Sequence, residues 1–291
     1  MSGANESRDS ADHAVSATAL PVRRVGVVGV GLIGGSVAMA VRRRGGHVVG
    51  IGRSAARLEQ AAAAGVLDDY GTKASALAET DLVVVCTPVD RVAADVRAAA
   101  SNTDAVLTDA GSTKATIVEA CGAVPRFVGS HPMAGSEKTG WRNASADLFE
   151  GRVCVLTPTG ATDAAAADRV DAFWQSLGGR TVRMSPPDHD TAVARVSHLP
   201  HFAAAALVAA AGPHTRVAAG GFRDTTRVAA GDAALWTSIA RENAGPLSDA
   251  LRDLSARLDA ARAAIDAGQW DAIEAMLRKA ADLRRAWGSE Q

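Results

Sequence analysis

A glycine-rich turn between a strand and a helix constrains this chain more than any other feature. The segment Gly29-Val30-Gly31-Leu32-Ile33-Gly34 follows the β-branched run at residues 25–28 and precedes a helical pattern at residues 36–44. In a dinucleotide-binding fold the first glycine allows the tight turn, the second lets the backbone approach a pyrophosphate, and the third lets helix pack on strand. The free N–H groups of the helix N-terminus then bind the phosphates. The turn therefore predicts a dinucleotide site, to which Ser36 would add a hydroxyl.

The residues around this turn predict a doubly wound sheet. Short apolar runs alternate with Ala-rich helical segments, which is typical of a parallel sheet covered by helices on both faces. Strands are expected at residues 25–28, 48–51, 82–86, 105–108, 127–130, 153–157 and 180–184, and helices at residues 36–44, 55–64, 89–99, 113–120 and 164–177. We therefore expect an α/β, Rossmann-type dinucleotide-binding domain over residues 21–185.

The character of the chain changes after Pro186-Pro187. Strand-like runs end there, and a pattern rich in Ala, Leu and Arg continues to Gln291. Residues 247–265 place their leucines and Ile265 on one face, which predicts a strongly amphipathic helix. Residues 186–291 are therefore expected to form an all-α domain.

Composition excludes several classes of partner. A formal net charge of -1 over 291 residues offers no electrostatic reason to bind nucleic acid or an anionic membrane. The three cysteines have no metal-like spacing, and no apolar stretch is judged long and charge-free enough to span a bilayer. Residues 1–20 are polar and lack the order of a secretory signal, so we expect a disordered leader and a cytoplasmic protein.

The end of the second strand bears on the choice of dinucleotide. A site that prefers NAD normally has Asp or Glu there, to accept from the ribose 2′-hydroxyl. This chain has Gly52, followed by Arg53 and Ser54, which can hold a 2′-phosphate, and Arg57 lies one turn later. A solvated loop charge is the alternative for Arg53. The sequence favours NADP and leaves NAD open.

Polar segments follow four of the predicted strands. They are the glycine turn, Thr87-Pro88-Val89, residues 109–114 and Ser130-His131-Pro132. The carboxyl ends of strands in a doubly wound sheet share one edge, and ligands bind in the crevice at that edge. We therefore expect these segments to converge, with Thr87 and Pro88 beside the cofactor.

His131 is the predicted catalytic residue. An imidazole titrates near neutrality and suits proton handling during hydride transfer. The polar, glycine-rich segment that follows, up to Gly140, is typical of a functional loop. Ser112 lies where a strand turns into a helix, so it is a second catalytic candidate or an N-cap. Lys114 is expected to be a solvated charge.

Two histidines open the helical domain. His198 and His201 are three residues apart and share a helix face, and Pro200 between them predicts a kink. They lack a third ligand, so no metal site is predicted; a substrate-facing role is expected for at least one of them. Further on, Arg223 fits a surface charge, whereas Arg227 fits either the surface or a bidentate carboxylate site.

These segments together resemble the prephenate/arogenate dehydrogenase family. They occur in the family's order and cover both predicted domains. The matching segments are residues 28–36, 87–89, 109–114, 131–140, 197–201 and 222–227. The motifs His-Pro-Met-Ala-Gly-Ser-Glu-Lys and Ser-His-Leu-Pro-His are the specific ones, whereas many dehydrogenases share the glycine motif.

The resemblance implies a cyclohexadienyl substrate, either prephenate or arogenate, between which the sequence does not choose. It implies that His131 accepts a hydrogen bond from the ring hydroxyl, supported by Ser112, while hydride passes to the nicotinamide and carbon dioxide is lost. It further implies that Arg227 receives a substrate carboxylate and that His201 contacts the substrate side chain, with His198 behind it. The family also implies a homodimer joined through the helical domains.

Two other interpretations remain. A 3-hydroxyacid dehydrogenase or imine reductase has a similar layout, but a catalytic Lys would be expected in the helical domain, where Lys279 is the only one. A non-catalytic dinucleotide sensor belongs to another class. It predicts binding without turnover and gives His131, Ser112 and Arg227 no reason to occur together.

Overall fold

The computed structural model describes residues 19–135 and 138–289, and the chain divides into two units after Pro186. The expected disordered leader falls almost entirely outside the described residues, as do Ser136 and Glu137 of the predicted functional loop. Each unit is described separately below.

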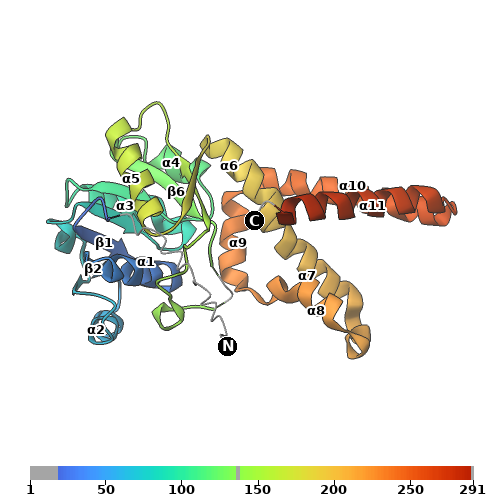
Figure 1. Ribbon diagram of the computed structural model, residues 1–291, viewed down its shortest axis with the longest axis horizontal. Coiled ribbons are helices and arrows are strands. Elements are labelled where there is room, and N and C mark those ends of the chain that lie inside the picture. The colour runs from blue at the N-terminus through green and yellow to red at the C-terminus, as the bar shows by residue number, and fades with distance from the viewer. Residues whose placement is uncertain (1–18, 136–137, 290–291) are drawn as a thin grey trace, which may run out of the picture. The chain divides into compact units, whose positions relative to one another are not determined.

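An eight-stranded sheet forms the first unit (Figure 1). Its order is β3-β2-β1-β4-β5-β6-β7-β8. The strands are β1 Arg24–Val28, β2 His47–Ile51, β3 Asp69–Gly71, β4 Leu82–Val85, β5 Val106–Asp109, β6 Phe127–Pro132, β7 Val153–Thr157 and β8 Arg180–Arg183. Neighbours from β3 to β6 are parallel, which confirms the doubly wound α/β prediction.

Two features of the sheet differ from the prediction. Strand β7 runs antiparallel to β6, and β8 then runs parallel to β7. No α-helix lies in the described part of the connection between β6 and β7, whereas a parallel pair needs a crossover, usually a helix. Strand β3 was not predicted, because its three residues Asp69–Gly71 contain no apolar run.

Helices flank this sheet close to their predicted positions. They are α1 Leu32–Arg43, α2 Ala55–Ala63, α3 Val89–Ala100, α4 Ala115–Ala120 and α5 Ala164–Ser176, with 3-10 turns η1 Ala74–Leu77 and η2 Trp141–Asn143. Helix α1 begins directly at the glycine turn, with Gly31 as its N-cap, and not at residue 36. Helix α4 begins two residues later than predicted, so Thr113 and Lys114 precede it.

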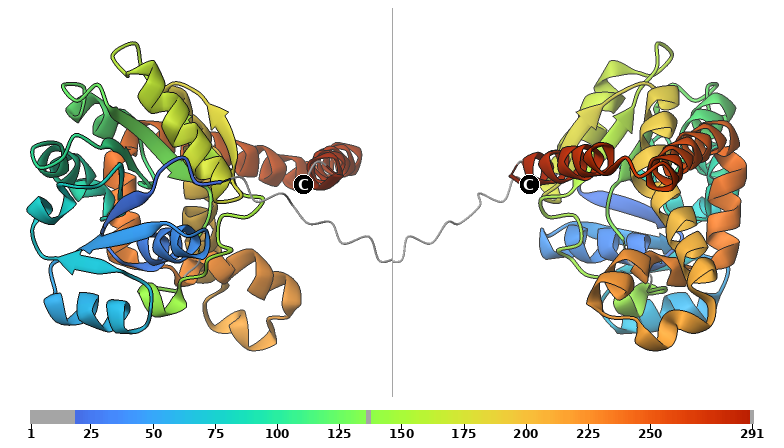
Figure 2. Two further views of the ribbon diagram at one scale, coloured as in Figure 1. Left: turned by 60° about the vertical axis from the view of Figure 1, so that its left-hand side comes forward. Right: turned by 90° about the vertical axis from the view of Figure 1, so that its right-hand side faces the viewer.

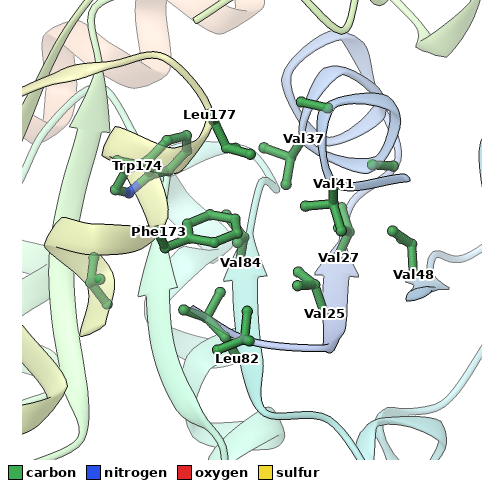
Figure 3. Packing of buried hydrophobic residues seen from close by; sticks show 14 of the residues in the cluster. Val25, Val27, Val37, Val41, Val48, Leu82, Val84, Phe173, Trp174 and Leu177 are labelled. Carbon is green, nitrogen blue, oxygen red and sulfur yellow. The ribbon is translucent and has the colours of Figure 1, made fainter. Parts of the chain in front are cut away.

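Valines and aromatic rings fill the core of the first unit (Figure 3). The labelled side chains come from the strands, from α1 and from the α5 region: Val25, Val27, Val48, Leu82, Val84, Val37, Val41, Phe173, Trp174 and Leu177. Each of these residues is 0% exposed. Full burial of one such aliphatic side chain stabilises a fold by about 1.5–3 kcal/mol. The core therefore holds α1 and the glycine turn firmly against the strands.

The second unit is helical, as predicted. It contains α6 Pro186–Val193, the π-helical turn η3 Ala194–His198, α7 Leu199–Ala211, η4 Gly212–Val217, α8 Gly220–Thr226, η5 Arg227–Ala230, α9 Ala233–Glu242, α10 Ala244–Asp266 and α11 Trp270–Ser289. The two long helices α10 and α11 lie side by side (Figure 2). The predicted kink takes the form of the π-helical turn, because Pro200 has no N–H to donate to the carbonyl of Val196.

One helix contradicts the expectation that no apolar stretch is long enough to span a bilayer. The continuous helix Pro186–Val217 is 32 residues long and apolar enough to cross a membrane by length and composition. It nevertheless contains His189, Asp190 and His198, all buried, and the side chain of Asn243 bonds to two of these residues. A bonded polar cluster of this kind indicates a helix packed within a protein unit, and helices of soluble proteins pass the same length test.

Candidate active site

The glycine turn has the geometry that a dinucleotide motif requires. Gly29 has a φ of +92°, a conformation that residues with a side chain rarely adopt. A Cβ at Gly34 would lie 2.1 Å from the carbonyl oxygen of Gly29, so helix and turn approach as closely as glycine permits. At Gly31, by contrast, an added Cβ would meet nothing within 4 Å. Of the three glycines, only Gly31 therefore leaves the backbone open to a ligand.

A cavity of about 600 Å³ opens beside this turn. Six of the predicted cofactor residues line it, namely Gly29, Gly31, Arg53, Ser54, Thr87 and Pro88. They come from the ends of β1, β2 and β4. Of the four segments expected to converge, the glycine turn and Thr87-Pro88 line this cavity, whereas residues 109–114 and 130–132 do not. Leu32, Ile33 and Gly34 form the first turn of α1 and do not line the cavity.

The chemistry of the cavity wall fits a dinucleotide. Thr87 Oγ1 and Asp95 Oδ2 are buried without a hydrogen-bond partner among the described residues. Arg53 and Arg57 are exposed at the cavity and form no ion pair within the described part of the chain. Two unpaired guanidinium groups suit a phosphorylated ligand, and the helix N-terminus at Gly31 has no side-chain cap that would compete with a phosphate.

Ser36 has a different role from the one predicted. Its side chain is 0% exposed, its hydroxyl donates to the carbonyl of Leu32 at 2.8 Å, and it accepts from the backbone N–H of Ser145 at 3.0 Å. The hydroxyl thus ties the segment around Ser145 to α1. Because both bonds are internal, the expected contribution of Ser36 to phosphate binding is wrong.

A buried ion pair lies at the end of β5. Asp109 and Lys114 are both 0% exposed and form a salt bridge, which corrects the expectation of a solvated Lys114. Asp109 also accepts from the backbone N–H groups of Gly111 at 2.8 Å and Ser130 at 3.0 Å. Removing one partner of a buried pair leaves an uncompensated charge, so this arrangement holds the loop after β5 against β6.

His131 lies on β6 directly after this anchored position. It is 8% exposed, and its backbone is paired with Val155 of β7. The preceding residue, Ser130, accepts a hydrogen bond from Trp174 Nε1 at 3.0 Å on the α5 side. Because successive side chains of a strand point to opposite faces, the His131 ring lies on the face away from Trp174.

Ser112 is not a helix cap. Lys114 occupies the N-cap position of α4, and the Ser112 hydroxyl makes no hydrogen bond to any described residue. Its side chain is half-buried. The N-cap interpretation of Ser112 is therefore wrong, and its catalytic role stays a prediction.

In the second unit, His201 stacks on Trp236. The ring centroids are 3.4 Å apart and the planes differ by 28°. His201 Nδ1 donates to the carbonyl of Ser197 at 3.1 Å, because a carbonyl can only accept. Burial lowers the pKa of His201; the Ser197 bond opposes this shift, and the charge of nearby Arg227 adds to it. The neutral ring therefore presents Nε2 as an acceptor near neutral pH.

His198 lies inside the second unit. It is 0% exposed, its Nδ1 accepts from the side-chain amide of Asn243 at 3.2 Å, and its ring meets Trp236 edge to face. These contacts lie within the second unit, and the predicted substrate contact by His198 stays a prediction. Arg227 is exposed and close enough to act on the His201 pKa, whereas Arg223 is 81% exposed, as expected for a surface charge.

Comparison with known proteins gives one consistent result. The family model for the prephenate dehydrogenase nucleotide-binding domain matches residues 37–183, and that for the prephenate dehydrogenase dimerization domain matches residues 185–279. Prephenate dehydrogenase of Bacillus subtilis is 33% identical over 276 residues, which cover 89% of this chain and 74% of that protein. The chain belongs to the prephenate dehydrogenase family.

Solved structures of this family agree. A prephenate dehydrogenase from A. aeolicus, in complex with hydroxyphenyl propionate and NAD+, has a TM-score of 0.86 and 31% identity, covering 91% of this chain and 98% of that one. The Synechocystis arogenate dehydrogenase has a TM-score of 0.81 and 33% identity, covering 91% and 99%. A 3-hydroxyisobutyrate dehydrogenase of M. tuberculosis is only 14% identical at a TM-score of 0.50, which shows a shared fold alone. The family expected from the sequence is confirmed.

Sequence analysis did not identify two residues that contact the predicted histidines of this prephenate dehydrogenase family member. Trp236 and Asn243 contact the two histidines, yet each is an isolated residue in a helical pattern and carries no motif. Among residues 19–135 and 138–289, no group of three or more His, Cys, Asp or Glu side chains is placed to hold a metal ion.

Proposed function

We propose that this chain catalyses the NAD(P)-dependent oxidative decarboxylation of prephenate or arogenate, with His131 as the group that accepts the ring-hydroxyl proton. The observation that carries the proposal is His131 at the end of β6, on the sheet edge that also bears the glycine turn and its cavity. The relatives support the substrate class, since they include a cyclohexadienyl dehydrogenase of Zymomonas mobilis, 35% identical over 84% of this chain and 88% of that protein.

Few side chains take part in the proposed reaction. A nicotinamide dinucleotide, when bound, supplies the hydride acceptor. His131 takes the hydroxyl proton as the carbinol carbon loses hydride, and Ser112 donates to or accepts from the same hydroxyl group. The carbon–carboxylate bond then breaks, its electron pair passes through the ring to the ring oxygen, and carbon dioxide leaves. That oxygen recovers the proton held by His131, which gives the phenol. Because the ring becomes aromatic, the residues chiefly need to orient the substrate and polarise one hydroxyl.

The second unit supplies the remaining contacts in this proposal. Arg227 carries an exposed guanidinium group, which can bind a carboxylate through two parallel hydrogen bonds. Nε2 of the neutral His201 ring is an acceptor, so in this proposal it takes a hydrogen bond from the ammonium group of an arogenate side chain; a prephenate side chain has no donor there. Stacking on Trp236 limits the rotation of the ring.

NADP is the proposed cofactor. Arg53, Ser54 and Arg57 stand together at the cavity, and no acidic side chain occupies the end of β2, where NAD-specific sites place one. Ser54 also caps α2 through its hydroxyl, which accepts from Arg57 N at 3.4 Å, so this turn is pre-organised. Loss of NADP preference in Arg53→Ala, with NAD turnover retained, tests this assignment.

Oligomeric state and location complete the proposal. Residues 21–185 form the nucleotide-binding domain, and residues 186–291 bind substrate and join two copies into a homodimer in the cytoplasm. The support for the dimer is the family's dimerization domain and the exposed apolar side chains of α10 and α11, among them Leu258, Leu277 and Leu283.

One assay tests the function. Purified protein is given prephenate and arogenate, each with NADP and with NAD, and reduced nicotinamide is followed by absorbance. Turnover of either acid, lost in His131→Asn, is the expected result. Absence of turnover with all four pairs, while a dinucleotide still binds, would overturn the proposal and favour a dinucleotide sensor.

A further inference from the structure

The lining of the cavity is partly apolar. Leu58, Leu77 and Ala98 belong to it, and Arg91 and Asp95 of α3 line the same cavity. Asp95 is the only acidic side chain among the described residues of this lining. Arg91, Asp95 and Ala98 recur at spacings of four and three residues, so they share one face of α3. Apolar side chains together with a few placed polar groups are typical of a site for an aromatic ring.

Asp95 has an unsatisfied oxygen at this position. Its side chain is 17% exposed, and Oδ1 accepts from Arg91 NH2 at 3.4 Å. Oδ2 is buried and has no partner among the described residues. Such an oxygen costs free energy until a donor reaches it.

The way a dinucleotide binds to this fold indicates which donor this is. The glycine turn at Gly31 lies where phosphates bind, and Arg53 with Ser54 lies where the ribose binds. The base of a dinucleotide follows the ribose, and adenine carries an exocyclic amine that can only donate in this setting.

We propose that Asp95 accepts a hydrogen bond from the exocyclic amine of the adenine base and so selects adenine over bases with a carbonyl oxygen at that position. Arg91 holds the other carboxylate oxygen and lies beside the base. The inference rests on the proposed dinucleotide binding, but it concerns the base alone and does not depend on which dienyl acid reacts.

Electrostatics favours this role over a simple helix pair. An Arg–Asp pair four residues apart on a helix, with the arginine half-exposed, contributes little to stability. A carboxylate in a cavity built for phosphates repels the ligand unless it makes a specific bond to it. Asp95 is therefore better explained by a bond to the ligand than by its pairing with Arg91.

The test compares two reduced cofactors in direct binding. NADPH and its hypoxanthine analogue, which has a carbonyl oxygen in place of the amine, are titrated by fluorescence, without substrate. We expect wild type to bind the analogue about 10–100-fold more weakly, because two acceptors would face each other. In Asp95→Asn the preference should fall below about threefold, since an amide both accepts and donates.

Arg91→Met is the matched control. If Asp95 contacts the base, this variant weakens both cofactors by a similar factor and retains the preference for adenine. Equal binding of the two cofactors by wild type, or an unchanged preference in Asp95→Asn, would overturn the proposal. So would loss of the preference in Arg91→Met, which would assign selection of the base to arginine. If NADPH itself does not bind, NADH and its hypoxanthine analogue give the same comparison, and turnover assays separately decide the proposed reaction.

Discussion

The two units of this chain bury apolar surface very differently. The first has a continuous core, in which Trp174, Phe173 and Phe149 pack edge to face. The second buries few large apolar side chains, among them Ile239 and Leu247. Most of the exposed large apolar residues belong to it: Val196, Leu207, Val208, Val217, Leu235, Leu258, Ile265, Trp270, Met276, Leu277, Leu283 and Trp287.

This difference follows from the architecture of each unit. A sheet covered by helices encloses its own apolar faces, whereas two long helices side by side leave an apolar stripe on each. Apolar patches of this kind are characteristic of surfaces that bind another protein. The first unit therefore encloses most of its large apolar side chains, and the second leaves apolar surface that a second copy would cover in the proposed homodimer.

The largest expected effect concerns the proposed catalytic residue of the first unit. Replacing His131 by Asn removes the proton acceptor and should lower kcat by about 10³-fold, within the range of general-base catalysis. NADPH binding and the circular dichroism spectrum should not change, since His131 does not line the cofactor cavity. His47→Asn is the control, because this histidine is 40% exposed and pairs with Asp69 on β3. Equal activity of the two variants would remove His131 from the mechanism.

The second prediction separates folding of the first unit from its ligand binding. Gly34→Ala places a methyl group against the Gly29 carbonyl oxygen, which is backbone and cannot move aside. The free energy of unfolding of this variant should be about 3 kcal/mol lower than that of wild type, which is the effect of severe overpacking. Gly31→Ala should unfold like wild type but bind NADPH at least about tenfold more weakly, because its methyl group occupies the open approach to the phosphates. Calorimetry and fluorescence titration measure the two effects.

Sequence reasoning succeeded where a local constraint is strict. The glycine turn was predictable because sterics at Gly29 and Gly34 act on the backbone within a few residues. The direction of β7 was not, since the side-chain alternation of a strand is the same in both directions. Ser36 was misassigned because its partner, Ser145, lies 109 residues along the chain. Lys114 also packs against Gly129 of β6, a contact that the local sequence pattern does not reveal.

The third prediction tests the dependence of the second unit on a partner. Leu258 and Leu283, on α10 and α11, are 62% and 65% exposed. Changing both to Glu should raise the dimer dissociation constant more than about tenfold, because charges are depleted in interface cores. Tyr70→Glu with Val182→Glu is the matched pair in the first unit, where these residues are 42% and 44% exposed. Sedimentation velocity should show monomers for the first pair only; dimers in both cases would place the interface elsewhere.

The smallest expected effect is a pH dependence within the second unit. Because burial lowers the pKa of His201, the unfolded chain binds a proton at higher pH than the folded chain does. Stability therefore increases with pH through this window and is lost as pH falls from about 6.5 toward the lowered folded pKa. Relative to His201→Gln, wild type should lose about 2 °C or less of Tm between pH 7.5 and pH 5.5. If wild type and His201→Gln show the same pH dependence, the pKa of His201 is the same in the folded and unfolded chain. Folding would then not favour the neutral ring, which the proposed contact with the substrate side chain requires.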